Sequence, residues 1–156
     1  MSSGTKTRKE IEISYMDSVN PPTMLEQKEL VDFLHKHLEE YGDPKQHISA
    51  AIEYACSSHM GKGGFVVIGK HRDRIVGVVV MNQTGMSGYI PENILVYIAV
   101  DSEARGMGVG KKLMEKALSR AKGSVALHVE PENPAKFLYE KLGFTNKYLE
   151  MRYSKK

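Results

Sequence analysis

The chain of 156 residues lacks the features that stabilise a small secreted fold or hold a protein in a membrane. It has one cysteine and no tryptophan, and no apolar run reaches the length of a membrane span. A single cysteine excludes an intrachain disulfide, and a transmembrane helix needs about 20 apolar residues. We therefore expect a soluble, cytoplasmic protein whose core forms from side-chain packing alone.

Neither sign of charge dominates the composition. The 22 lysines and arginines against 19 aspartates and glutamates leave a formal net charge of +3 at pH 7. A nucleic-acid-binding domain typically concentrates a larger basic excess on one face, so nucleic acid is not an expected partner. The six histidines and the lone cysteine show no spacing typical of a zinc site, so no metal is expected.

The distribution of polar and apolar residues along the chain indicates one domain. Residues 1–9 lack an apolar stretch, so we expect a disordered tail there rather than a signal peptide or a membrane anchor. Residues 10–156 contain no internal repeat or low-complexity linker, and their length suits a single domain. Cys56 continues the apolar stripe of Ile48 and Ile52 at helical spacing, which predicts a core cysteine rather than a nucleophile.

Hydrophobic periodicity and capping signals predict both strands and helices. The segments Thr23 to Glu26 and Asp43 to Gln46 have the pattern of capping boxes, and Gly123 and Gly143 end two later helices. The expected strands are 11–16, 65–70, 75–81, 94–100, 124–130 and a last one around 148–153, with helices over 23–41, 43–56, 109–121 and 134–142. The order β-α-α-β-β-β-α-β-α-β predicts an α/β fold of the α+β type, with a mixed central sheet and helices on both sides.

A glycine-rich run joins the strand 94–100 to the helix that begins at Val109. Residues 105–111 read R-G-M-G-V-G-K, and glycine at three alternate positions lets the backbone turn tightly and approach a ligand. The unpaired N–H groups and the dipole of a helix N-terminus favour an anion there. The spacing matches neither the P-loop nor the dinucleotide fingerprint. By itself, the run predicts either a phosphate-binding loop or a glycine-rich turn without a ligand.

A second motif follows the strand 124–130. Asn133-Pro134-Ala135 begins a short helix with Asn as N-cap, and the string N-P-A-x-x-L-Y-E-K-L-G-F runs to Phe144. The glycine-rich run fits the pattern Arg/Gln-x-x-Gly-x-Gly/Ala. In this order and at this separation, the two motifs resemble the GNAT acetyltransferase superfamily. The resemblance is specific from Ile94 to Phe144, and elsewhere it rests on the order of the elements.

The resemblance implies an N-acetyltransferase that moves an acetyl group from acetyl-CoA to an amine by direct attack. In this family the fourth strand bulges and separates from the fifth, so that its free backbone groups pair with the pantetheine arm, while the glycine loop holds the pyrophosphate. Carried over residue by residue, the resemblance implies that acetyl-CoA contacts Ile98, Ala99, Val100, Arg105, Gly106, Met107, Gly108, Val109, Gly110, Lys111 and Asn133. Asn133 would cap its helix, contact acetyl-CoA, or do both.

The resemblance also implies catalytic roles. Tyr139 matches the family position of the general acid, and a phenol with an ordinary pKa of about 10 can donate to a departing thiolate. The alternative is that Tyr139 only packs against its helical neighbours. Some family members carry a glutamate base in the fourth strand. Here the nearest acidic residue is Glu92, just before that strand, and it is the tentative base, with His128, Glu130 or a water chain as alternatives.

Two questions stay open at the level of sequence. The fold and the loop would also suit a noncatalytic acyl-CoA-binding or regulatory module, although the presence of Tyr139 favours an enzyme. The amine acceptor has no motif of its own. In the family the first two helices help to shape its site, here together with the loop 82–92 and the C-terminal segment. A homodimer is compatible with the sequence, because dimers are the commonest oligomers.

Overall fold

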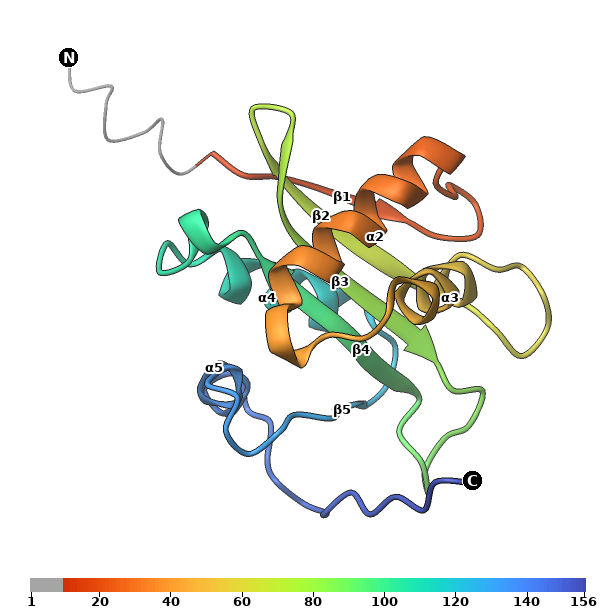
Figure 1. Ribbon diagram of the computed structural model, residues 1–156. Helices are drawn as coiled ribbons and strands as arrows, with labels where there is room; N and C mark the ends of the chain where they lie inside the picture. The colour runs from red at the N-terminus through yellow and green to blue at the C-terminus, as the bar shows by residue number, and fades with distance from the viewer. Residues whose placement is uncertain (1–9) are drawn as a thin grey trace.

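A five-stranded mixed sheet forms the centre of the computed structural model, which describes residues 10–156 (Figure 1). The predicted tail, residues 1–9, lies outside the described residues. The strand order is β1-β2-β3-β4-β5, and all pairs are antiparallel except β4 with β5. The elements are β1 (Glu12–Met16), α2 (Met24–Leu38), η1 (Glu39–Tyr41), α3 (Lys45–Ala55), β2 (Gly64–His71), β3 (Arg74–Gln83), β4 (Asn93–Val100), η2 (Ser102–Ala104), α4 (Val109–Arg120), β5 (Val125–Leu127) and α5 (Ala135–Lys141).

Helices cover both faces of the sheet, as the sequence predicted (Figure 1). Helices α2 and α3 pack on one face against side chains that include Ile68 and Val78, and α4 and α5 pack on the other against Val67 and Val79. Neighbouring residues of a strand point to opposite faces, so the apolar strands β2 and β3 contribute to both layers. None of the described helices has the length and apolar character needed to cross a membrane.

The fold class and the order from the first strand to the last helix agree with the prediction, but the expected strand around residues 148–153 is not formed. After α5 the described chain contains no further strand. The side chains of Tyr148, Leu149, Met151 and Tyr153 are each at least 81% exposed. The segment therefore gains no burial that would hold it against the short strand β5.

The two predicted capping boxes have different outcomes. At the start of α2, Thr23 Oγ1 accepts from the Glu26 N–H at 3.1 Å, and Glu26 Oε1 accepts from the Thr23 N–H at 2.9 Å, so this box is confirmed. The second prediction is wrong, because α3 begins after Pro44 without a side-chain cap. Asp43 accepts from the hydroxyl group of Tyr97 instead.

Helix α4 lies close to β3 because Gly77 has no side chain. A Cβ atom at this position would lie 2.4 Å from Leu113 Cδ1 and 3.3 Å from Val109 Cγ1. Both Leu113 and Val109 are buried on the inner face of α4. Glycine in a strand often marks such a close approach. The contact sets where the N-terminus of α4 meets the end of β4.

We expect Gly77→Ala to destabilise the protein by about 1–3 kcal/mol, because the added methyl group overpacks the contact with Leu113. Leu113→Ala alone should cost about 2–5 kcal/mol through the cavity that it leaves. The double variant should lose less free energy of unfolding than the two single variants lose together, since the methyl group at position 77 fills part of that cavity. Urea unfolding of the four proteins measures these differences. A double variant that loses the full sum or more would contradict the close contact.

Candidate active site

Strands β4 and β5 are paired only at their beginnings. Their parallel ladder ends with the pair Leu95 and Leu127, after which β5 stops and β4 continues to Val100. At the same place a register shift against β3 leaves Val96 without a partner. Such a bulge bends a strand and increases its twist. The second half of β4 therefore has an open edge.

The open edge carries the main-chain groups of alternate residues. The Asp101 N–H donates to a carbonyl oxygen of β3 at 2.9 Å. Because alternate residues of a strand present their N–H and C=O groups to opposite edges, Ala99 bonds to its β3 partner Val78, whereas Ile98 and Val100 face the open edge. Of the three strand residues predicted to contact acetyl-CoA, Ile98 and Val100 are suitably placed. Ala99 offers no free main-chain group.

The loop before α4 presents a row of free amides. Gly106 and Gly108 have φ values of +85° and +80°, with open space where a Cβ atom would lie. The first hydrogen bond at the start of α4 runs from the Lys112 N–H to the Gly108 carbonyl oxygen at 3.1 Å. In the described part of the chain, no backbone acceptor pairs with the five successive N–H groups of residues 107–111. Together with the dipole of a 12-residue helix, they form a site for an anion.

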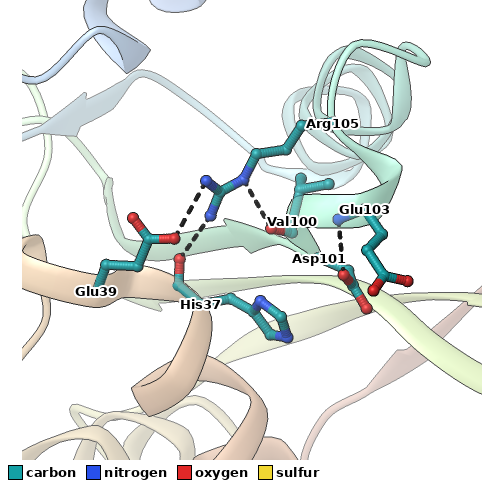
Figure 2. A network of polar contacts seen from close by, with 6 residues as sticks. All are labelled: His37, Glu39, Val100, Asp101, Glu103 and Arg105. Atoms are coloured by element: carbon teal, nitrogen blue, oxygen red, sulfur yellow. Dashed lines mark hydrogen bonds and ion pairs between the residues drawn. The ribbon is translucent and has the colours of Figure 1, made fainter.

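Arg105 ties this loop to the end of α2 (Figure 2). Its Nε donates to the carbonyl oxygen of Val100 at 3.1 Å, and one Nη donates to that of His37 at 2.9 Å. The other Nη lies 3.3 Å from Glu39 Oε2. The carbonyl groups at a helix C-terminus lack partners, so the guanidinium group caps α2. These contacts show that Arg105 positions the loop, and its predicted contact with acetyl-CoA stays a prediction.

The turn from β4 into the loop depends on Asp101, which the sequence analysis did not identify. This side chain is 8% exposed, and its Oδ1 accepts from the Glu103 N–H at 2.9 Å at the start of η2 (Figure 2). Its other oxygen lies 3.3 Å from an Nη of Arg74. The hydrogen bond from Glu103 is the main cause that lowers the pKa of Asp101. The charged carboxylate fixes the direction in which the chain leaves β4.

Tyr139 lies on α5 within the apolar layer that α4 shares with the sheet. Its side chain is 8% exposed, and the centre of its ring lies 5.9 Å from that of Phe144. Burial raises the pKa of Tyr139 to about 12. The phenol therefore stays protonated near neutral pH, which is the state that a proton donor needs.

Helix α5 is attached beside the start of α4. A Cβ atom at Gly110 would lie 3.5 Å from Leu138 Cδ2 and 3.6 Å from Val100 Cγ2, so α4, α5 and the end of β4 meet there. Asn133 Oδ1 accepts from the Ala135 N–H at 2.9 Å, which confirms its capping contact. This junction places α5, the helix that carries Tyr139, beside the end of β4.

Glu92 lies just before the first residue of β4. Its Oε1 accepts from the Ser124 N–H at 2.8 Å, which joins the turn before β5 to the start of β4. This hydrogen bond is the main cause that lowers the pKa of Glu92 and makes it a weaker base. Ile98 is six residues further along, or about 20 Å in an extended strand. The structure thus places Glu92 away from the open edge of β4, and its role as a base stays a prediction; His128 and Glu130 are exposed beyond the end of β5.

The other face of β4 holds a pair that the sequence analysis missed. Tyr97 Oη donates to Asp43 Oδ2 at 2.6 Å. Tyr97 is 8% exposed, whereas Asp43 is exposed in the loop between η1 and α3. Burial first, and then the Asp43 carboxylate, raise the pKa of Tyr97. The two residues are 54 positions apart, so no local pattern could have connected them.

Cys56 follows the last residue of α3 and is half-buried against the layer that α2 and α3 form. Burial is the larger cause that raises the pKa of its thiol to about 11. The thiol therefore stays protonated near neutral pH, and it is a weak nucleophile. This agrees with the prediction of a core cysteine.

Comparisons with known proteins identify the family. The sequence profile described as Acetyltransferase (GNAT) family matches residues 30–144. The 5-NmdU N-acetyltransferase of Pseudomonas phage PaMx11 is 32% identical over 84 residues, which are 53% of this chain and 58% of that enzyme. The glucosamine 6-phosphate N-acetyltransferase of Arabidopsis thaliana is 30% identical over 120 residues, which are 74% of this chain and 69% of that enzyme. The chain therefore spans little more than half of the phage enzyme.

Solved structures share the fold. A protein of Pyrococcus horikoshii OT3 aligns with a TM-score of 0.69 and 26% identity, over 91% of this chain and 93% of that one. The aminoglycoside N-acetyltransferase AAC(6')-Iy, solved in complex with CoA, aligns with a TM-score of 0.66 and 18% identity, over 94% and 95%. The family profile spans the glycine loop and the motif of α5. The chain belongs to the GNAT family of acetyltransferases, a family of acyl-transfer enzymes.

Proposed function

We propose that residues 10–156 form one N-acetyltransferase domain that moves an acetyl group from acetyl-CoA to an amine. The observation that carries the proposal is the position of the free amides at the start of α4, next to the open edge of β4. An anion site beside an unpaired strand edge suits a ligand that has a pyrophosphate at one end and an amide-containing arm at the other.

The residues that would hold acetyl-CoA act mainly through their backbone. The N–H groups of residues 107–111 would bind the pyrophosphate, and Lys111, exposed in the first turn of α4, adds positive charge beside it. The N–H and C=O groups of Ile98 and the N–H of Val100 would pair with the arm, since Arg105 already uses the Val100 carbonyl group. Asn133 uses its side-chain oxygen as a cap, which leaves its NH₂ group for the ligand.

The transfer forms a C–N bond and breaks the C–S bond of the thioester, so the nitrogen loses a proton and the sulfur gains one. Tyr139 would donate a proton to the departing sulfur, because its pKa of about 12 keeps the hydroxyl group protonated near neutral pH. An N–H group at the open edge of β4 would polarise the carbonyl group. The proton from the amine would pass to water or to the exposed side chain of His128 or Glu130.

Tyr139→Phe should lower turnover by about 10²–10⁴-fold, the usual contribution of a positioned acid. It should leave the affinity for acetyl-CoA unchanged. Amine-dependent release of the CoA thiol gives turnover, and calorimetry gives affinity, since the chain has no tryptophan for fluorescence. Tyr15→Phe, on strand β1 at the other edge of the sheet from β4 and β5, is the matched control and should change neither quantity. Unchanged turnover in Tyr139→Phe would remove the assigned role.

The raised pKa of Tyr139 leads to a separate expectation for the pH profile. The protonated phenol is the active form, so its contribution persists as pH rises and is lost only as pH passes through about 12. A phenol with the ordinary pKa of about 10 would lose its proton earlier. We therefore expect Tyr139 to cause no fall in turnover near pH 10. An alkaline fall centred there that disappears in Tyr139→Phe would contradict the burial of this hydroxyl group.

Gly108→Ala should weaken the binding of acetyl-CoA by about tenfold or more. The left-handed backbone at this position costs a residue with a side chain about 1–2 kcal/mol, and the new methyl group enters the space beside the free amides. Gly61→Ala is the matched control, because its φ of +86° and its open surroundings are equivalent but it lies in the turn before β2. Calorimetry with acetyl-CoA measures both. An equal loss of affinity in the control would show that the effect does not come from the glycine loop.

A further inference from the structure

Residues 39–43 cross the open edge of β4 on the face opposite to α4. At one end, Arg105 connects this segment to the end of β4 (Figure 2). At the other end, Asp43 accepts from the Tyr97 hydroxyl group at 2.6 Å. Tyr97 immediately precedes Ile98, whose main-chain groups face the open edge. The Asp43 carboxylate is thus held on the face of β4 opposite to α4 by the residue that precedes Ile98.

The buried tyrosine fixes this carboxylate. The ring of Tyr97 belongs to the apolar layer beneath α2 and α3, so its hydroxyl group has little freedom to move. Asp43 itself is exposed, and its Oδ2 is the oxygen that accepts from Tyr97. Among the hydrogen bonds and ion pairs of residues 10–156, none involves Oδ1 of Asp43. A fixed carboxylate with an unused oxygen can accept a hydrogen bond from an ammonium group.

The charges near this segment favour a cation. Arg105 is already paired with Glu39 at 3.3 Å, and Lys45, two residues after Asp43, is already paired with Asp32 at 3.0 Å. The hydroxyl oxygen of Tyr41 lies 3.5 Å from the Glu132 carbonyl oxygen, so the segment also approaches the loop after β5. After the larger effect of burial, the pKa of Tyr41 is raised by the nearby carboxylates of Glu40, Glu130 and Glu132. The acceptor side of the edge is therefore negative, and the side with the α4 N-terminus is positive.

We propose that Asp43 selects the acceptor by binding an ammonium group that does not react. The reacting nitrogen must be neutral to attack the carbonyl carbon, so a carboxylate that holds a cation holds a different nitrogen. The acceptor class is a diamine or polyamine, with one amine at the open edge of β4 and a second, charged one on Asp43. Tyr97 is a positioning residue that acts through Asp43. The inference rests on the proposed acetyl transfer to an amine.

Two probes that differ by one ammonium group test the inference: 1,4-diaminobutane and 1-aminobutane. Thiol release from acetyl-CoA gives kcat/KM for each. The wild-type protein should use the diamine up to about fivefold better, the size of one exposed charge pair. Asp43→Asn should abolish this preference through a higher KM for the diamine, with the monoamine unaffected. The amide oxygen of this variant can still accept from Tyr97, so the loop should keep its position.

Three further variants separate charge from structure. Asp43→Glu restores the charge and should recover part of the preference. Tyr97→Phe should reduce the preference through KM, because the carboxylate is no longer held. Glu53→Gln removes an exposed carboxylate of α3 and should change nothing. An equal loss for both amines in Asp43→Asn, or a wild-type protein without the preference, would overturn the role of Asp43.

A third probe, glucosamine 6-phosphate, distinguishes this inference from the proposed function. Its phosphate group is repelled by the negative acceptor side, so we expect it to be used less well than the diamine. Thiol release with glucosamine 6-phosphate, but with neither 1,4-diaminobutane nor 1-aminobutane, would overturn the role of Asp43. It would still support the proposed acetyl transfer. No release with any of the three amines would overturn both.

Discussion

The separation of β4 from β5 is the constraint on which the rest of the site depends. Pairing ends at Leu95 and Leu127, and the bulge at Val96 turns the remaining half of β4 away from its neighbour. Main-chain groups at an unpaired edge form a template for another extended chain. Because β3 keeps its bonds to the other edge of β4, the open edge, where Ile98 and Val100 lie, is held in place.

The elements around this edge have opposite electrostatic character. The close packing of α4 on Gly77 sets where its free amides meet the end of β4, and that side is positive. The segment 39–43 crosses the edge from the other face and carries carboxylates. Arg105 connects the two sides, since its guanidinium group contacts both the end of β4 and the end of α2. An anionic donor and a cationic acceptor would therefore approach from different sides.

The features that local sequence patterns predicted correctly depend on contacts between near neighbours in the chain. The capping box at Thr23 forms within one turn, and Asn133 caps α5 two residues away. The second capping box did not form because Asp43 bonds to Tyr97, and Glu92, the tentative base before the start of β4, bonds to the Ser124 N–H. In both cases, a side chain with a plausible local role forms a hydrogen bond with a residue that is distant in the sequence.

The sequence by itself determined the element order, the glycine loop before α4 and the helix that carries Tyr139, and with them the family. Hydrophobic periodicity, capping residues and motif spacing involve residues that are close together in the chain, so they can be recognised in the sequence alone. Only the tertiary structure decided where β4 separates from β5, that Arg105 caps α2, and that Asp43 accepts a hydrogen bond from Tyr97. Those contacts join residues far apart in the chain, and packing of the whole core selects them, since each alone contributes only about 1 kcal/mol.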